Sequence, residues 1–270
     1  MTMRRRLLVT LPVVSLFLTG LMVPGLAQSD GVEVEPLEES AEVEPLEESA
    51  EVEPSEESAK KLQKAEGEVE EAITVLEKIM SDPDKRIPAE LLAQSEGIAI
   101  IPDVYQAGFI FGGRRGTGVM MVRYPDGTWS NPTFVSLTGG SFGLQVGAKS
   151  SDIILVFPSR ETVNEVLSRD YRLGGNITGT AGPESTPGAA GERFSKNQIY
   201  TYSRSQGLFG GLTLNGSKLG LKKDRVQYFY GNDAITTRKI FTDPFIPAPV
   251  VVNALRDVLE QSESGTFSRF

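Results

Sequence analysis

Residues 97–124 read GIAIIPDVYQAGFIFGGRRGTGVMMVRY. Short apolar runs alternate in this stretch with Gly, Pro and Asp, a pattern typical of β-strands separated by turns. The runs Ile98–Ile101, Gly108–Phe111 and Val119–Tyr124 are shorter than an ordinary helix. This stretch therefore predicts consecutive strands and decides the fold class of the chain.

Similar runs continue toward the C-terminus and bring the predicted total to about ten short strands. Pro125-Asp126-Gly127 and Asn215-Gly216 are turn signals, of which Asn215-Gly216 is the stronger hairpin sign. Gly174–Asn197 is rich in Gly, Pro and Ser and is predicted to be a long loop. The further predicted strands are Phe134–Leu137, Leu144–Ala148, Ile153–Phe157, Ile199–Ser203, Leu208–Leu214, Ser217–Leu221 and Val226–Tyr230.

Four segments show helical periodicity. In Lys60–Met80, Leu62, Val69 and Leu76 recur every seven residues, and Ser55 or Ser58 can cap the start. The other predicted helices are Pro88–Ser95, Ser159–Tyr171 and Val250–Gln261. Helices at both ends of a run of strands predict an α+β fold. We expect a mostly antiparallel, glycine-rich sheet, curled or barrel-like, with flanking helices.

The first 27 residues have the features of a secretory signal peptide. Arg4, Arg5 and Arg6 precede an apolar run from Leu7 to Val23, and small residues precede a cleavage point after Ala27. An uncleaved membrane anchor is the alternative interpretation. We expect an exported chain, periplasmic or associated with the cell envelope.

An acidic repeat follows in residues 28–59. EVEPLEESA occurs twice, at Glu33–Ala41 and Glu42–Ala50, and a third copy at Glu51–Ala59 has Ser55 in place of Leu. Such a segment has too little apolar surface to fold alone, so it predicts an extended tether. The predicted organisation is a signal peptide (1–27), a linker (28–59), a folded domain (60–243) and a C-terminal helix with a tail (244–270).

Composition excludes several classes of function. The 270 residues include no His and no Cys, which removes Ser-His-Asp and Cys-His hydrolases and Cys- or His-based metal sites. The net charge of −9 arises in the linker, because residues 60–270 carry 24 basic and 23 acidic side chains. A near-neutral body argues against a nucleic-acid partner. We expect a protein that is not an enzyme and has neither cofactor nor metal.

Many motifs of residues 60–243, taken in order, resemble the SYLF domain family. They are Gly97–Pro102 (GIAIIP), Gly108–Gly113 (GFIFGG), Gly118, Gly127–Ser130 (GTWS), Pro132, Leu137–Gly143 (LTGGSFG), Gln145, Gly147, Leu173-Gly174, Ala181–Pro183 (AGP), Tyr202–Phe209 (YSRSQGLF), Gly211 and Phe229–Gly231 (FYG). The resemblance implies a lipid-binding module. In eukaryotic members it implies phosphoinositide binding, largely through a basic amphipathic helix, and in a yeast member actin binding as well.

The matching helix here is Lys60–Met80, and it departs from that pattern. Lys60, Lys61 and Lys64 could contribute to headgroup binding, but five Glu residues follow them, which an anionic surface would repel. We therefore expect the apolar stripe of this helix to pack on the sheet. A seam for a partner helix is the alternative.

Two basic clusters are candidate headgroup sites. Arg114 and Arg115 lie in the glycine-rich stretch Gly112–Gly118, where paired guanidinium groups suit a phosphate. The alternative is a glycine hairpin with two exposed Arg side chains. Lys218, Lys222, Lys223 and Arg225, near a predicted hairpin, form the second cluster; it could face a headgroup or protect a sheet edge.

The leading hypothesis is a non-catalytic module that binds an anionic or phosphate-bearing membrane lipid. An envelope structural or protein-interaction domain is the second hypothesis, and the sequence leaves the oligomeric state open. A carboxylate-dependent enzyme is the third, although no spacing selects a pair among Asp103, Asp126, Asp152, Asp224 and Asp233. Gly139–Gly143 fits a nucleophile elbow, but the chain has no His to serve as its base.

Overall fold

The computed structural model describes residues 55–108, 111–142, 147–168, 171–174, 177–179, 194–196, 198–207 and 214–267. All of them belong to one compact unit, Val52–Phe270. The signal peptide, most of the acidic repeat and most of the predicted loop 174–197 lie outside the described residues, as do residues 208–213 of one predicted strand.

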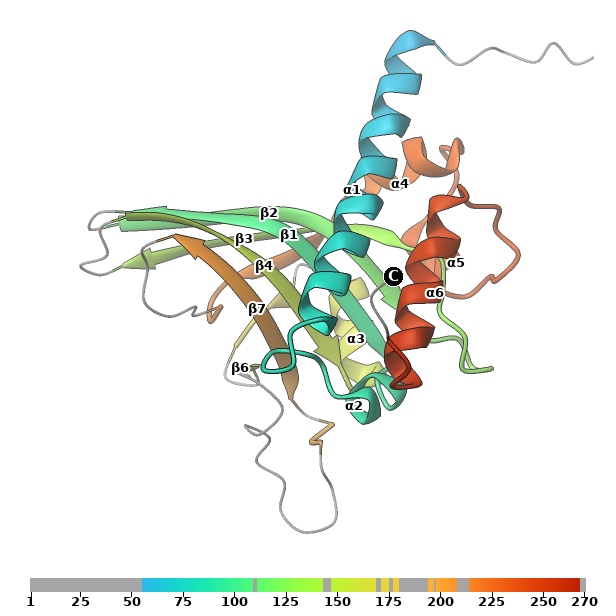
Figure 1. The fold of residues 1–270 in the computed structure, drawn as a ribbon. Helices are drawn as coiled ribbons and strands as arrows, with labels where there is room; N and C mark the ends of the chain where they lie inside the picture. Colours follow the sequence, from blue (N-terminus) through green and yellow to red (C-terminus); the bar gives the residue numbers. More distant parts are fainter. Residues whose placement is uncertain are drawn as a thin grey trace, which may run out of the picture. The chain divides into compact units, whose positions relative to one another are not determined.

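The unit is built on one curled sheet (Figure 1). Its eight described strands lie in the order β5-β8-β3-β2-β1-β4-β7-β6, and every neighbouring pair is antiparallel except β6–β7. The α+β fold with a mostly antiparallel curled sheet is therefore confirmed. The strands are β1 (Gly97–Gly108), β2 (Phe111–Val122), β3 (Thr133–Phe142), β4 (Gly147–Phe157), β5 (Tyr171–Arg172), β6 (Ile177–Gly179), β7 (Ile199–Gly207) and β8 (Lys218–Leu221).

Six helices are described alongside the sheet. They are α1 (Glu56–Met80), α2 (Ala89–Ala93), α3 (Arg160–Ser168), α4 (Lys223–Tyr230), α5 (Thr237–Ile240) and α6 (Val251–Glu263). The Oγ of Ser55 caps α1 by accepting a hydrogen bond from the backbone N–H of Ser58. The helix therefore starts within the last repeat copy, four residues before the predicted start, because Glu56 and Glu57 in the first turn favour a helix N-terminus.

The apolar stripe of α1 packs inside the unit, as predicted. Val69, Ala72 and Leu76 are fully buried. Figure 1 shows α1 crossing the sheet, and it packs against α4 and α6 as well as β1 and β2. Because this stripe is already covered within the chain, it is not a seam for a partner helix.

The sheet has two chemically different faces, which we call inner and outer. The inner face packs against α3, since Val163 comes within 2.9 Å of a Cβ built at Gly97. The outer face packs against α1 and α4, as the edge-to-face contact between Phe134 and Phe229 shows. Beyond these helices, inner-face side chains of β1 to β4 such as Val104 stay buried, whereas outer-face side chains such as Tyr105 are exposed.

Two local predictions are corrected by the structure. Val226–Tyr230, predicted as a strand, lies in helix α4, where the buried Val226 and Phe229 are three residues apart on one face. Gly112–Gly118, for which a glycine hairpin was one of the two interpretations, lies inside the twelve-residue strand β2. The central strands β1 to β4 are consequently longer than the short strands predicted.

Candidate functional site

Arg114 and Arg115 do not form a pair. They are consecutive residues of β2, so their side chains point to opposite faces of the sheet. Arg114 is buried on the inner face and Arg115 is exposed on the outer face. The expectation of two guanidinium groups converging on one phosphate, and that of two exposed Arg side chains, are both wrong, because alternation along the strand separates the two residues.

On the inner face, Arg114 belongs to a polar row that crosses three strands. Gln106 of β1 is the register partner of Arg114 in β2 and of Lys149 in β4. Register partners lie side by side on the same face of a sheet. The exposed fractions of the three residues are 6% for Arg114, 5% for Gln106 and 4% for Lys149. Two cationic side chains and an amide are therefore buried next to one another.

A glycine in the next strand lets a fourth polar residue join this row. Gly139 of β3 is the register partner of Arg114. A Cβ built at Gly139 would lie 2.7 Å from Oγ of Ser217 and 3.2 Å from Cγ of Arg114. A side chain at position 139 would therefore crowd both the Ser217 hydroxyl and the Arg114 stem. We call Arg114, Gln106, Lys149 and Ser217 the inner polar row.

Electrostatics and hydrogen bonding mark the inner polar row as unusual. Burial lowers the pKa of Arg114 and that of Lys149, and the neighbouring Arg114 charge lowers the pKa of Lys149 further. The Oε1 of Gln106 and the Oγ of Ser217 are buried and have no hydrogen-bond partner. Buried polar atoms of this kind are rare in folded proteins and call for an explanation.

The outer face carries a second row at the neighbouring level. Arg115 pairs with Thr138 of β3, Thr138 with Lys218 of β8, and Lys218 with Arg172 of β5. On the other side Arg115 pairs with Tyr105 of β1, whose side chain is 56% exposed. We call Arg172, Lys218, Arg115 and Tyr105 the outer basic row. Adjacent strands are about 4.8 Å apart, so the row spans roughly 20 Å.

Apart from Lys218, the second predicted cluster lies elsewhere. Lys222 and Lys223 lie at the start of α4. The backbone N–H of Lys222 donates to the carbonyl oxygen of Phe134 in β3. Phe134 is four residues along β3 from Thr138, the register partner of Arg115. That interval corresponds to about 13 Å. Arg225 forms a largely buried ion pair with Glu68 of α1 and joins the two helices. The structure thus separates Lys222, Lys223 and Arg225 from Arg114 and Arg115.

The lysines of α1 have local contacts. Lys61 pairs with Glu57 at 2.6 Å and lies 4.5 Å from the centre of the Tyr228 ring. The hydrogen bonds to Glu57 and Tyr228 raise the pKa of Lys61. Lys60 pairs with Glu56 at 3.9 Å, and Lys64 is exposed. Among these three, Lys61 thus has a structural role between α1 and α4.

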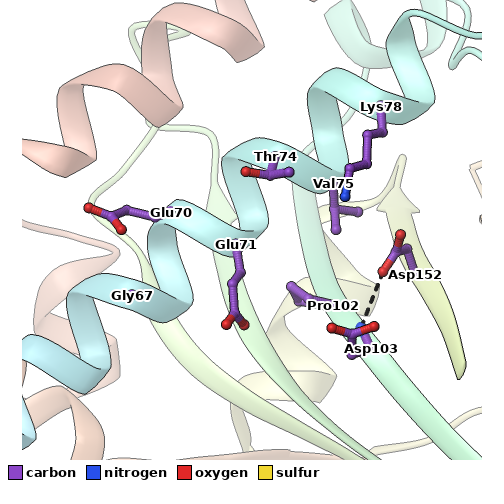
Figure 2. A pocket seen from close by; sticks show the side chains of 9 residues that line it. All are labelled: Gly67, Glu70, Glu71, Thr74, Val75, Lys78, Pro102, Asp103 and Asp152. Atoms are coloured by element: carbon purple, nitrogen blue, oxygen red, sulfur yellow. Dashed lines mark hydrogen bonds between the residues drawn. The ribbon is translucent and has the colours of Figure 1, made fainter.

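An acidic pocket of about 550 Å³ lies between α1 and the outer face. Figure 2 shows Glu71 and Lys78 projecting from α1 toward the strands that carry Asp103 and Asp152. Asp152 Oδ1 accepts a hydrogen bond from the backbone N–H of Asp103 at 3.2 Å. Ser150 donates to the Asp103 carboxylate at 3.0 Å.

These two carboxylates stabilise an irregularity in the sheet. The register between β1 and β4 shifts between Ile101 and Val104, and Asp103 has a φ of +43°. Bulges of this kind leave backbone groups that need local partners.

Two kinds of site are not found among the described residues. Within this part of the chain, no group of three or more carboxylates is arranged to hold a metal ion. No described helix is both long and apolar enough to span a bilayer.

Five members of the two rows were not predicted from the sequence: Gln106, Lys149, Ser217, Arg172 and Tyr105. Alternation along β2 would have separated Arg114 from Arg115 once that stretch was predicted as a strand. The pairing of Gln106 with Lys149 depends on the register between β1 and β4, which no motif in the sequence indicates.

The described unit is an α+β domain with one curled sheet. Its candidate sites are the inner polar row and the outer basic row. Residues 138–262 match the family model Ysc84, described as "Las17-binding protein actin regulator". The chain belongs to this family, the SYLF domain family.

Several relatives are similar over about two thirds of the chain. Protein YSC84 of Saccharomyces cerevisiae is 33% identical over 190 residues, which cover 69% of this chain and 40% of the relative. SH3 domain-containing YSC84-like protein 1 of Homo sapiens is 34% identical over 181 residues, covering 66% of this chain and 52% of the relative. LAS seventeen-binding protein 3 of S. cerevisiae is 33% identical over 181 residues, with shares of 66% and 39%. The matched region thus spans about half of these relatives or less.

Proposed function

We propose that this chain is a non-catalytic module that binds anionic, phosphate-bearing lipid headgroups from the aqueous side of a membrane. The outer basic row is the observation that carries the proposal. Three cationic side chains, Arg172, Lys218 and Arg115, follow one register line on an exposed part of the sheet. Arg115 makes no ion pair with another described residue, so its guanidinium group is available to a phosphate.

Tyr105 extends this row at the end next to Arg115. An exposed Tyr has an apolar ring and a polar hydroxyl, which suits the boundary between headgroups and water. Each basic side chain near an anionic surface contributes about 1 kcal/mol. The three charges together amount to roughly a hundredfold in affinity, enough for reversible, salt-sensitive attachment.

Vesicle co-sedimentation of residues 28–270 tests the proposal. We expect binding to anionic vesicles, weaker binding at high salt and little binding to zwitterionic vesicles. The double variant Arg115→Gln/Arg172→Gln should bind anionic vesicles about thirtyfold more weakly, because two charges of about 1 kcal/mol each are lost.

A matched control removes the same charge elsewhere. Arg238 and Lys239 are exposed on α5, at the other end of β3. The double variant Arg238→Gln/Lys239→Gln should bind like the wild type. Equal losses of vesicle affinity in both double variants would show that net charge alone causes the effect. Absence of wild-type binding would exclude the membrane role.

We also propose that the chain is exported and cleaved after Ala27, and that it acts in the periplasm or at the cell envelope. The charged start, the apolar run and the small residues before the cleavage point support this. The mass of the mature protein isolated from its native cell checks it. A mature chain beginning at Gln28 is the expected result, and a chain retaining Arg4–Arg6 would contradict it.

A protein partner is the second candidate function. The family description names Las17 binding, and one relative is called LAS seventeen-binding protein 3. Retention of partner capture by the variant Arg115→Gln/Arg172→Gln, together with absence of vesicle binding by the wild type, would favour this function over the lipid-binding one.

A further inference from the structure

The pocket between α1 and the outer face is lined by charges that have no opposite partner. Glu71 and Lys78 line it from α1, and Asp103 and Asp152 line it from the sheet (Figure 2). Glu70 of α1 is the fifth charged residue in the lining. None of these five side chains forms an ion pair with a described residue. Four carboxylates and one ammonium leave a net charge of −3 around a volume of about 550 Å³, so the pocket attracts cations.

Asp152 is the most buried of these carboxylates and lacks a compensating charge. It is 7% exposed, whereas Asp103 and Glu71 are exposed. The backbone N–H of Asp103 donates to Oδ1, and no other described residue donates to the Asp152 carboxylate. Arg204 of β7 is its register partner but forms no ion pair with it. A buried carboxylate is costly without such compensation, and its Oδ2 is left for a cation in the pocket.

The lining of the pocket suits an elongated organic cation. No three of the described carboxylates come together as the ligands of a metal ion do. Glu71 and Asp152 lie on opposite walls, on α1 and β4, and the apolar Val75 and Pro102 line the same pocket. Ammonium groups donate strong hydrogen bonds to carboxylates, and the methylene groups between them can contact apolar side chains. The volume is also within the range of about 300–1,000 Å³ that small-molecule sites occupy.

A glycine in the middle of α1 leaves the pocket open. Gly67 lies in the interior of this 25-residue helix, where glycine is less favourable than alanine. A Cβ built at Gly67 would have no atom within 4 Å, so packing does not require a glycine here. Because Gly67 lines the pocket, a larger side chain at this position would occupy its volume. The open pocket therefore gives a reason for a residue that the helix itself disfavours.

We infer that this pocket binds a linear polyamine, a chain of methylene groups that carries two or more ammonium groups. One ammonium group would meet Asp152 and Asp103 on the sheet, and another would meet Glu71 on α1. Lys78 has the same charge as the ligand and opposes its binding. The site goes beyond the membrane attachment proposed above, because it takes a cation and includes no residue of the outer basic row.

Thermal unfolding of residues 28–270 at increasing spermidine concentration, at constant ionic strength, is the test. We expect a saturable rise in Tm, because a ligand that binds only the folded chain stabilises it. Spermidine bound to the acidic repeat would bind folded and unfolded chains alike and would not shift Tm. Butylamine, with one ammonium group on a similar methylene chain, should give no comparable rise. An equal rise with butylamine would overturn the inference.

Three variants of α1 locate the effect in the pocket. Glu71→Gln should raise the apparent Kd for spermidine about tenfold, because it removes one charge-assisted hydrogen bond. Lys78→Gln should lower the Kd about threefold, because it removes a like charge at an exposed position. Glu77→Gln is the matched control, since Glu77 is exposed on α1 but does not line the pocket. It should leave the Kd unchanged, and equal Kd values for Glu71→Gln and Glu77→Gln would contradict a site in the pocket.

A further pair of variants keeps the test independent of the sheet. Asp152→Asn should weaken binding at least tenfold, but it also changes a residue that supports the irregularity between β1 and β4. Gly67→Leu leaves the sheet untouched, and the free space around its Cβ allows wild-type circular dichroism. Its side chain should fill the pocket and abolish the rise in Tm with spermidine. Absence of this rise in the wild type, or its persistence in Gly67→Leu, would overturn the inference.

Discussion

Alternation along a strand decides what Arg114 and Arg115 can do. Arg115 faces water, where its charge costs little, whereas Arg114 is buried beside Lys149. Burial lowers the pKa of both Arg114 and Lys149, and the Arg114 charge lowers that of Lys149 further, so the inner face carries an electrostatic cost that the outer face avoids. The two residues of this dipeptide thus lie in chemically different surroundings.

The buried Lys149 predicts a pH dependence of stability. Burial and the Arg114 charge lower its pKa below the ordinary value of about 10.4. Between the lowered pKa and the ordinary one, the unfolded chain binds more protons than the folded chain. The free energy of unfolding should therefore rise with pH across this alkaline window, as the charge penalty disappears.

The variant Lys149→Met isolates this contribution. It lacks the penalty, so at about pH 7 its free energy of unfolding should exceed that of the wild type by about 1 kcal/mol. The difference should shrink as the pH approaches about 10, because wild-type Lys149 then loses its proton. Urea unfolding in phosphate-free buffer at both pH values measures it. A difference that stays constant with pH would show that Lys149 pays no such penalty.

At the scale of elements, the apolar runs predicted where the strands lie but not how far they extend. The stretch Gly112–Thr117 has no apolar alternation, yet it continues β2 because β3 pairs with all of it and β1 pairs with Gly112–Arg115. Val226–Tyr230 is short enough to fit either a strand or a helix, and its packing on Phe134 decides for the helix. Tertiary contacts, and not the local sequence pattern alone, therefore determine the secondary structure of these two segments.

Two glycines of β2 allow a direct test of strand packing. A Cβ built at Gly118 would lie 2.0 Å from the carbonyl oxygen of Ile100 in β1, whereas a Cβ built at Gly113 would have no atom within 4 Å. Gly118→Ala must push β1 and β2 apart, so we expect a loss of about 3 kcal/mol or more in the free energy of unfolding.

Gly113→Ala is the matched control in the same strand and should change stability by less than about 0.5 kcal/mol. Urea denaturation of both variants, followed by circular dichroism, compares them directly. Similar stabilities for the two variants would mean that β1 and β2 can separate at Gly118 without cost, contrary to the close approach seen here.

For the whole molecule, a cluster around Arg123 joins segments that are far apart in sequence. Arg123 donates to the carbonyl oxygens of Leu92 and Ser95 at 2.9 Å, and it pairs with Glu263 of α6 at 2.7 Å. Its guanidinium group lies 4.3 Å from the Trp129 ring, and the Trp129 indole N–H donates to Glu263. The C-terminal helix is thereby fastened to α2 and to the end of β2.

This cluster predicts that α6, which the sequence analysis assigned to a separate C-terminal segment, stabilises the whole unit. Glu263→Ala would leave the largely buried Arg123 without its carboxylate and the Trp129 N–H without its acceptor. We expect a loss of about 2 kcal/mol or more in the free energy of unfolding, since breaking a buried ion pair leaves an uncompensated charge.

Glu260→Ala, which removes an exposed carboxylate one turn earlier on α6, should change stability by less than about 0.5 kcal/mol. If thermal and urea unfolding show the same stability for both variants, the C-terminal helix is an appendage whose attachment through Arg123 does not support the sheet.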